Sequence, residues 1–318
     1  MAPFEAGNCR VRLTGMRYGA QDIVLYELEA LDAADLPSVE AGAHLDLHIP
    51  GGLVRQYSLV APLCDARRYV IGVKREERGR GGSLWLHDHA RVGQILDVSA
   101  PRNHFALVHD DAPVILLAGG IGITPIYSMY RALLDQGRAV QLHYWCRTGE
   151  HALFRSTLEG QSGVTLHYSR HIDPGRKSLA QALQGMADDA HVYCCGPQAM
   201  LDELEDIGAD LGPRLHLERF QAAAPAAVAE QGFTVVLARS GSEMLVSPGE
   251  SILQVLCDAG VDVMYSCEQG ICGACEVRVL EGEPVHADSV QSAEEHVRRG
   301  TMMVCCSSSR SSRLVLDL

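Results

Sequence analysis

The sequence predicts a multidomain protein with an antiparallel six-stranded β-barrel, then an α/β domain with a parallel sheet, then a small mixed sheet around one helix. Three observations support this: short alternating strands up to about residue 105, apolar strands that alternate with helices from residue 113, and a cysteine-rich loop near the C-terminus. With 318 residues and 47% hydrophobic content, the chain is long enough for several separate cores. We expect domains at 1–107, 108–221 and 232–318. Residues 222–231, which show no charge pattern and no strand signal, are expected to form a linker.

The first domain is predicted from period-two alternation of apolar and polar residues between Gly and Pro turns. The expected strands are 11–14, 23–28, 44–49, 54–59, 69–74 and 94–98. Six short strands at this spacing are typical of a closed antiparallel barrel.

Two motifs of the first domain are candidates for binding an anionic ligand. RQYS at 55–58 lies on the fourth predicted strand, and GRGGS at 79–83 follows the fifth. GRGGS precedes a helix-like segment, so its N–H groups would stand at a helix N-terminus with Arg78 and Arg80 adjacent, which suits a phosphate. Each motif alone also has an ordinary explanation, as a turn or as a plain strand.

The second domain begins with the apolar strand VILLA, the loop GGIGITP at 119–125 and a helix at 126–134. We expect Thr124 to cap this helix and Pro125 to fit its first turn. The glycines Gly119, Gly120 and Gly122 would let the backbone approach a pyrophosphate. The loop departs from GxGxxG, because a proline stands where the third glycine would be.

Alternating strands and helices continue to about residue 217, which predicts a parallel sheet with a nucleotide at the carboxyl ends of its strands. The expected strands are 140–145, 164–168, 191–195 and 215–217, and the expected helices are 153–158, 179–186 and 199–207. The motif CCGP at 194–197 puts Cys195 and Gly196 at the same edge as GGIGITP. A Gly-Pro pair that merely ends a strand is the alternative.

The last domain is predicted from strands at 234–238, 244–246, 277–280 and 314–316 and from one amphipathic helix. The helix presents Ile252, Val255, Leu256 and Ala259 on one face and ends at Gly260.

The cysteine loop CEQGICGAC has C-x4-C-x2-C spacing and is followed by another cysteine about thirty residues later. This is the spacing of a plant-type 2Fe-2S cluster, with Cys267, Cys272 and Cys275 as ligands and a fourth ligand near residue 305. Gly270 and Gly273 would adopt positive φ and bring backbone N–H groups to the sulfurs. A zinc site usually has two C-x2-C pairs, and free buried thiols are the other alternative.

The net charge of −13 gives no basic surface for nucleic acid and suggests a partner with a more basic docking face. The N-terminus has no apolar signal core, and the longest apolar run, 113–126, is interrupted by glycines, so we expect a soluble, cytoplasmic protein without a membrane segment. We expect the remaining cysteines to be reduced, small buried side chains. These are Cys9, Cys64, Cys146, Cys194 and Cys257.

The motifs RQYS, GRGGS, GGIGITP, CCGP and CEQGICGAC, in this order and ending in LVLDL, resemble those of the phthalate dioxygenase reductase family, which includes the vanillate demethylase reductases. The resemblance covers essentially the whole chain. It implies a barrel that binds FMN, a middle domain that binds NADH, and a C-terminal β-grasp ferredoxin domain that passes electrons to a Rieske-type terminal oxygenase. A flavin is needed there because hydride carries two electrons and the cluster accepts one.

The resemblance also implies roles for individual residues. It implies flavin contacts from Arg55, Tyr57, Ser58, Ile71, Val73 and Lys74, and contacts to the FMN phosphate from Arg80, Gly81, Gly82 and Ser83. It implies NADH contacts from Gly120, Thr124, Pro125, Cys195, Gly196 and Pro197. Ser58 would lie near the reactive ring nitrogen and Cys195 in the nicotinamide pocket, which makes these two the catalytic candidates. Phe220 resembles an aromatic near the flavin, although an ordinary packed phenylalanine is an equal alternative.

Spacing leaves open whether Cys305 or Cys306 is the fourth iron ligand. The segment 302–306 is expected to be extended, so that the two side chains would point to opposite faces. The resemblance, counted back from the terminal LVLDL, selects Cys305 and makes Cys306 a buried neighbour.

NADH is expected to be preferred over NADPH, because CRTGEH after the second strand of the middle domain carries Glu150 and only one arginine, Arg147. Two functions other than an oxygenase reductase are also compatible with these motifs. The same electron path could serve a cytochrome monooxygenase or a free ferredoxin, or the chain could be a redox-sensing regulator. A regulator would not need three cofactor motifs, and no basic DNA-binding element is present.

Overall fold

The computed structural model describes residues 8–31, 36–60, 67–170, 177–220 and 232–318. The chain divides into two compact units, Met1–Arg219 and Phe220–Leu318. The predicted linker 222–231 and Cys64 lie outside the described residues.

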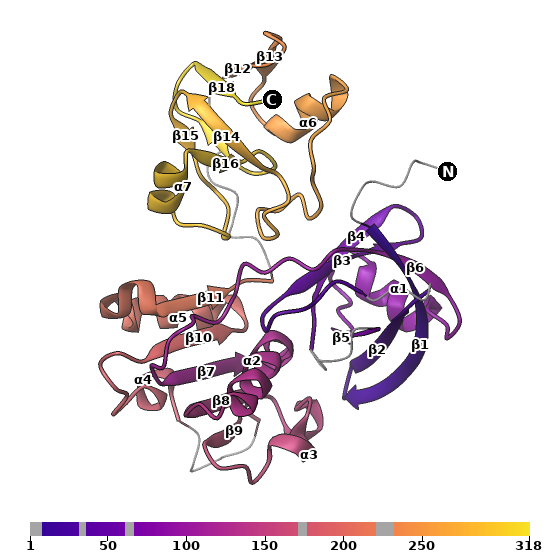
Figure 1. Ribbon diagram of the computed structural model, residues 1–318, viewed down its shortest axis with the longest axis vertical. Coiled ribbons are helices and arrows are strands. Elements are labelled where there is room, and N and C mark those ends of the chain that lie inside the picture. Colours follow the sequence, from indigo (N-terminus) through magenta and orange to yellow (C-terminus); the bar gives the residue numbers. More distant parts are fainter. Residues whose placement is uncertain (1–7, 32–35, 61–66, 171–176, 221–231) are drawn as a thin grey trace. The chain divides into compact units, whose positions relative to one another are not determined.

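The first part of unit one is a six-stranded antiparallel sheet, as predicted (Figure 1). Its order is β4-β3-β6-β1-β2-β5, and the edge strands β4 and β5 meet at a bridge between Leu59 and Ile71. Its strands are β1 (Asn8–Ala20), β2 (Ile23–Ala30), β3 (His44–Ile49), β4 (Leu53–Ser58), β5 (Arg68–Lys74) and β6 (Ile95–Ser99), and α1 (Gly82–His89) follows β5. β1 is longer than predicted, because the pairing skips a residue between Leu13 and Gly15 and the alternation on which the prediction rested breaks there.

The second part of unit one is a five-stranded sheet in which every pairing is parallel, again as predicted. The order is β11-β10-β7-β8-β9, so the chain leaves β7 toward one side and later returns on its other side at β10. The strands are β7 (Val114–Gly119), β8 (Val140–Cys146), β9 (Val164–Tyr168), β10 (His191–Cys195) and β11 (Leu215–Glu218). Ligands of such sheets bind at the carboxyl edge beside this reversal.

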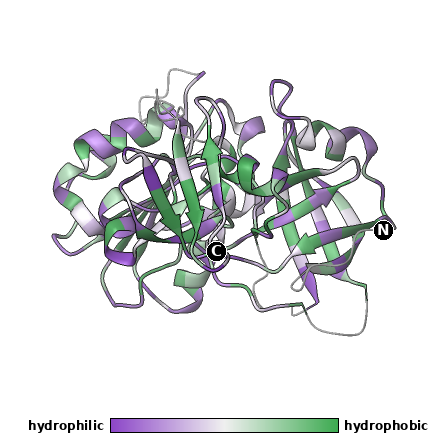
Figure 2. Cartoon of the chain, turned by 90° about the horizontal axis from the view of Figure 1, so that it is seen from above, coloured by the Kyte–Doolittle hydropathy of each residue, from purple (hydrophilic) through white to green (hydrophobic). Residues whose placement is uncertain are grey.

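Helices cover both faces of the parallel sheet. Leu116 in β7 packs with Ile126 of α2 (Ile123–Asp135), whereas Leu117 packs with Leu201 of α5 (Gln198–Ile207). The remaining helical segments are η1 (Gly120–Gly122), η2 (Gly149–His151), α3 (Arg155–Leu158), α4 (Leu179–Ala182) and η3 (Ala209–Arg214). The strands are hydrophobic along much of their length, while the helices also carry hydrophilic residues (Figure 2). The predicted helices 153–158 and 179–186 are shorter than expected.

Unit two is a mixed five-stranded sheet around α6 (Ile252–Asp258), in the order β13-β12-β18-β14-β16. β12 and β18 are parallel, and the other neighbours are antiparallel. The strands are β12 (Phe233–Leu237), β13 (Glu243–Val246), β14 (Glu276–Glu281), β16 (Thr301–Met303) and β18 (Arg313–Leu316), and β15 (Pro284–Val285) pairs with β17 (Ser308–Ser309). The sequence did not predict α7 (Ala293–Arg299), because this helix has no apolar stripe and its Val297 is 77% exposed.

Candidate functional site

The loop after β7 packs directly against the loop after β10. A Cβ on Gly122 would lie 2.2 Å from the carbonyl oxygen of Cys195, and one on Gly119 would lie 2.5 Å from Cδ of Pro197. These glycines are therefore required by the contact between the two loops. Gly120, with φ of 54°, borders open space and remains the glycine at which a pyrophosphate could approach.

The prediction that Thr124 caps α2 is wrong. The N-cap is Gly122, without a side-chain cap, and Thr124 lies inside the first turn with its Oγ1 donating to the carbonyl of Ile121 at 3.0 Å. The reason is that η1 leads into α2 without an extended residue between them. Pro125 lies in the first turn, as expected.

Thr124 connects the nucleotide-binding edge to the barrel. A Cβ on Gly72 of β5 would lie 2.9 Å from Cγ2 of Thr124, so only glycine allows this strand to approach so closely. The side chains of Ile71 and Val73, on either side of Gly72, are buried in the barrel core. Contacts of these two residues to a flavin would therefore come from their backbone. Lys74 Nζ lies 3.0 Å from a carboxylate oxygen of Glu76.

The barrel contains buried hydroxyl groups that lack hydrogen-bond partners among the described residues. Ser58 is 5% exposed and Tyr26 is 1% exposed, and the hydroxyl oxygens of both are unpartnered. An unsatisfied buried hydroxyl costs about 1–3 kcal/mol, so a ligand with acceptor atoms fits here. Burial raises the pKa of Tyr57, which keeps this neighbouring phenol neutral.

The GRGGS loop and Arg55 form one structure at the start of α1. A Cβ on Gly82 would lie 2.4 Å from Cγ of Arg55, and the guanidinium of Arg55 donates to the carbonyl of Arg80. Gly81, with φ of 85°, is the N-cap, and no side chain caps the helix, so its first N–H groups can serve an anion. Ser83 Oγ accepts from the N–H of Glu76 at 3.1 Å and so holds the loop.

Cys195 and Glu218 are paired neighbours at the carboxyl ends of β10 and β11. Glu218 was not predicted as a site residue; its position in HLERF, at the end of the strand that pairs with β10, was the available signal. Cys195 is fully buried, and burial raises the pKa of its thiol well above the ordinary value. Burial of the carboxyl group raises the pKa of Glu218 to about 8, although the Cys195 thiol donates to this carboxyl group. The Oε2 atom of Glu218 has no hydrogen-bond partner among the described residues. Both groups are therefore largely neutral at pH 7.

The four predicted cluster ligands are all buried. Cys267, Cys272, Cys275 and Cys305 are 1%, 1%, 3% and 8% exposed. Hydrogen bonds from the Cys272 and Cys305 thiols lower the pKa of Cys267 well below its usual range, and a hydrogen bond from the Cys305 thiol lowers the pKa of Cys275. The same hydrogen bonds raise the pKa of the donating thiols of Cys272 and Cys305, so the four sulfurs lie together and share their protons, which iron would replace.

Backbone N–H groups surround the first ligand. The N–H groups of Gln269 and Ile271 donate to Sγ of Cys267 at 3.3 and 3.5 Å. Gly270 and Gly273 have φ of 66° and 70°, as predicted. The positive φ lets the loop turn its amides inward, the arrangement that stabilises a negatively charged cluster.

The prediction of an extended segment 302–306 is wrong. β16 ends at Met303, and the next three residues form a turn in which Ser307 donates to the carbonyl of Met303 at 3.1 Å. In this turn Cys305 contacts Cys267 and Cys275, whereas a Cβ on Gly270 would lie 2.5 Å from Sγ of Cys306. The geometry favours Cys305 as the ligand, for a reason other than strand alternation.

Several other sequence predictions concern single residues. Cys146 and Cys194 are buried, whereas Cys9 and Cys257 are only partly buried, unlike the prediction. Phe220 is 38% exposed and begins unit two, so its role near a flavin stays a prediction. No helix in the described ranges is long and apolar enough to cross a membrane.

Two stretches of the chain match known domain families. Residues 116–206 match the family described as oxidoreductase NAD-binding domain, and residues 235–309 match the 2Fe-2S iron-sulfur cluster binding domain. Together with the site geometry, these matches define an oxidoreductase that carries an NAD-binding domain and a 2Fe-2S domain in one chain.

Relatives that match the chain over nearly its full length identify the family within this class of oxidoreductases. The chain is 45% identical to phenoxybenzoate dioxygenase subunit beta of Ectopseudomonas oleovorans over 97% of each chain, and 45% identical to tetrachlorobenzoquinone reductase of Sphingobium chlorophenolicum over 94% of each. It is 41% identical to phthalate dioxygenase reductase of Burkholderia cepacia over 99% of each chain. The chain belongs to the phthalate dioxygenase reductase family.

Solved structures agree with this assignment. A phthalate dioxygenase reductase, described as a modular structure for electron transfer from pyridine nucleotides to 2Fe-2S, matches with a TM-score of 0.72 and 38% identity over 98% of each chain. An intact type IV self-sufficient cytochrome P450 monooxygenase matches with a TM-score of 0.90 and 34% identity. That match covers all of this chain and 43% of the longer protein.

Proposed function

We propose that this chain is the NADH-dependent reductase component of a Rieske-type aromatic oxygenase or demethylase system, with electrons passing from NADH through FMN and the 2Fe-2S cluster to the oxygenase. The observation that carries the proposal is the contact of Gly72 with Thr124, which joins the flavin strand of the barrel to the nucleotide-binding edge. A hydride donor and a flavin must meet face to face, and this contact brings their two sites together.

The barrel is the proposed FMN site. Bound FMN would convert a two-electron hydride transfer into single-electron steps. Ser58, Tyr57 and the backbone of β5 would hold the ring, and the unpartnered Ser58 hydroxyl would donate to a ring nitrogen. The phosphate would bind at Arg55, Arg80, Gly81, Gly82 and Ser83. FMN fits better than a longer nucleotide because the α1 N-terminus ends the site on a terminal phosphate.

The edge formed by the β7 and β10 loops is the proposed NADH site. Gly120, Thr124 and Pro125 would hold the pyrophosphate, and Cys195, Gly196 and Pro197 would form the nicotinamide pocket. We add Glu218 to this pocket because its carboxyl group is paired with Cys195. A neutral thiol beside a largely neutral carboxyl group excludes water and positions the ring without a fixed charge.

We propose domains at 1–107, 108–221 and 232–318 with a linker at 222–231, and the boundary between the compact units lies close to the end of the second domain. In the last domain Cys267, Cys272, Cys275 and Cys305 would bind the cluster. The cytoplasm, where thiols stay reduced, is the proposed location.

The oxygenase partner is proposed from the relatives. Besides the phthalate and phenoxybenzoate proteins, they include the toluene-4-sulfonate monooxygenase system reductase subunit of Comamonas testosteroni and the vanillate O-demethylase oxidoreductase of a Pseudomonas strain. The net charge of −13 favours transient docking on a more basic face. A cytochrome P450 acceptor is the second candidate, favoured by the TM-score of 0.90 to part of a self-sufficient cytochrome P450 monooxygenase.

Two experiments test the proposal. Acid release and chromatography should recover one FMN per chain, with two irons and two inorganic sulfides; FAD would contradict the flavin assignment. Electron delivery should then be compared for a Rieske oxygenase and for a P450, each mixed with the purified reductase and NADH. Turnover of the Rieske oxygenase alone supports the proposed partner, and turnover of the P450 alone would replace it with the second candidate.

A further inference from the structure

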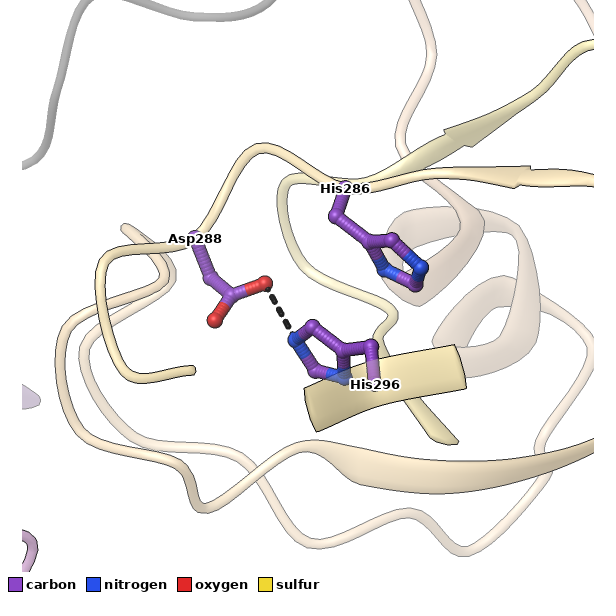
Figure 3. A group of neighbouring side chains, drawn as sticks. All are labelled: His286, Asp288 and His296. Atoms are coloured by element: carbon purple, nitrogen blue, oxygen red, sulfur yellow. Dashed lines mark hydrogen bonds and ion pairs between the residues drawn. The ribbon is translucent and has the colours of Figure 1, made fainter. Parts of the chain in front are cut away.

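Unit two contains a group of metal-binding side chains apart from the cluster cysteines. His286 and Asp288 lie on the loop after β15, and His296 lies on α7. Each residue offers one ligand atom, and these atoms all lie within 4.8 Å of one another. Figure 3 shows the three side chains next to each other, with the carboxylate of Asp288 directed at the ring of His296.

The hydrogen bonds of the group leave one nitrogen without a partner. His296 Nε2 lies 2.8 Å from Asp288 Oδ1, and His296 Nδ1 lies 3.2 Å from Oγ1 of Thr301. His286 Nδ1 is enclosed and has no hydrogen-bond partner within the described part of the chain. A buried imidazole nitrogen of this kind is either a loss of stability or a ligand position.

Two histidine pairs in unit one show what a purely structural pair does with its nitrogens. In both, the facing ring nitrogens hydrogen-bond each other. These pairs are His143–His167 at 3.1 Å and His191–His216 at 3.0 Å. The rings of His286 and His296 instead stack face to face, with centroids 4.2 Å apart and an angle of 8°, so their nitrogens cannot bond each other and His286 Nδ1 needs a different partner.

Burial and charge also suit a cation. The side chains of Asp288 and His296 are completely enclosed, whereas His286 is only partly buried and so borders a path to solvent. Asp288 supplies a carboxylate, whose negative charge suits a cation.

We propose that His286, Asp288 and His296 bind one divalent transition-metal ion of the zinc type, with water completing the coordination. Two imidazoles and a carboxylate are a ligand set that zinc accepts. Because a metal lies in the plane of each imidazole that binds it, the partly buried His286 ring would turn out of its stack on His296 to reach the ion. The metal would take the place of the proton between His296 and Asp288. Coordination at Nε2 requires the tautomer with its proton on Nδ1, and Oγ1 of Thr301 is placed to accept that N–H.

The site has a consequence for the cluster loop. Ser289, next to Asp288, donates its N–H to the carbonyl of Gly270 at 2.8 Å, and a Cβ on Gly270 would lie 2.9 Å from Cα of Asp288. Asp288 also accepts from the N–H groups of Val290 and Gln291. A bound ion would therefore tie α7 to the segment that supports the loop around Cys267 and Cys272, and would slow iron loss.

The test uses the full chain with its 2Fe-2S cluster in place, so that iron occupies the cysteines. After incubation with zinc chloride and gel filtration, elemental analysis should find one zinc and two irons per chain. His286→Phe preserves the stacked ring and removes both nitrogens, so its zinc content should fall to background. His109→Gln, at an exposed histidine, should bind zinc like the wild type.

A second variant keeps the test decisive if His286→Phe folds poorly. Thr301→Val retains all three ligands and removes the acceptor for His296 Nδ1, so zinc affinity, measured by competition with a chromophoric chelator, should fall about ten- to a hundred-fold. Three results would overturn the proposal: no zinc in the wild type, equal zinc in the wild type and His286→Phe, or zinc uptake that is matched by loss of iron.

Discussion

The two units of the chain place cysteine in opposite chemical surroundings. In unit one, Cys195 is enclosed at a strand end beside Glu218, and burial raises its pKa. In unit two, Cys267 receives hydrogen bonds from neighbouring thiols and from two backbone amides, and its pKa is lowered. The same side chain is thus a neutral thiol at Cys195, where we propose the nicotinamide pocket, and is shifted toward the thiolate at Cys267, which we propose as an iron ligand.

The largest effect is expected at the thiolate site. Cys305→Ser should remove the electron paramagnetic resonance signal of the reduced 2Fe-2S cluster and stop transfer beyond the flavin, because a hydroxyl group is a poor iron ligand. NADH should still reduce the flavin, since unit one is intact. Cys306→Ser is the matched control and should retain the cluster, because its sulfur lies against Gly270. The reverse behaviour of the two variants would show that the ligand assignment is wrong.

The next effect is expected in unit one, at Arg55 and Ser58 on β4 of the barrel. Arg55→Ala should weaken FMN binding about ten- to a hundred-fold, because a charge-assisted hydrogen bond contributes about 1.5–3 kcal/mol. Ser58→Ala should retain FMN and slow flavin reduction by NADH about tenfold, which corresponds to ~1.4 kcal/mol.

Equilibrium dialysis measures the FMN affinity, and stopped-flow absorbance of flavin-saturated protein measures the rate. Arg17→Ala, at an exposed arginine of β1, is the charge control. An unchanged rate in Ser58→Ala would remove Ser58 from the site.

A smaller effect is expected on the preference for NADH over NADPH. Arg147 and Glu150 are both exposed, after β8 and in η2 respectively. We expect NADH to exceed NADPH in kcat/KM by about tenfold or more, because a carboxylate accepts from ribose hydroxyls and repels a 2′-phosphate. Glu150→Arg should reduce this preference, measured by steady-state cytochrome c reduction. Equal efficiency of the two nucleotides with the wild type would refute the prediction.

Local patterns in the sequence predicted much of this molecule. Alternation predicted the barrel strands, and the spacing of Cys267, Cys272 and Cys275 predicted three residues that the structure buries together. Both signals are local: side chains two apart share a strand face, and ligands of one loop are fixed by its length. The capping box of Ser292 and Glu295 was a further local signal, and it would have indicated the start of α7.

The missed features depend on contacts between distant segments. The run MMVCC looks extended, but Val304 donates to the carbonyl of Cys275 and the chain turns there. The pairing of Cys195 with Glu218 depends on the register of two parallel strands, which no local pattern specifies. The group of His286 and His296 likewise arises only when the loop after β15 folds onto α7.

The last and smallest prediction uses Glu218 to sharpen the contrast between the two cysteine sites. Its pKa is raised to about 8 in the folded chain, above the ordinary value of 4.5. Between these pH values the folded state retains a proton that the unfolded state releases, so this contribution to stability is complete below about pH 4.5 and is lost as the pH rises through 8.

Glu218→Gln cannot titrate, so its stability should not show this decrease with pH. The thermal midpoint of the wild type should therefore fall relative to that of the variant from pH 5.5 to 9. Glu203→Gln, at an exposed glutamate, should follow the wild type. If the wild type and Glu218→Gln keep a constant difference across this range, Glu218 is ionised in the folded protein, and the site beside Cys195 is not the neutral one that the comparison requires.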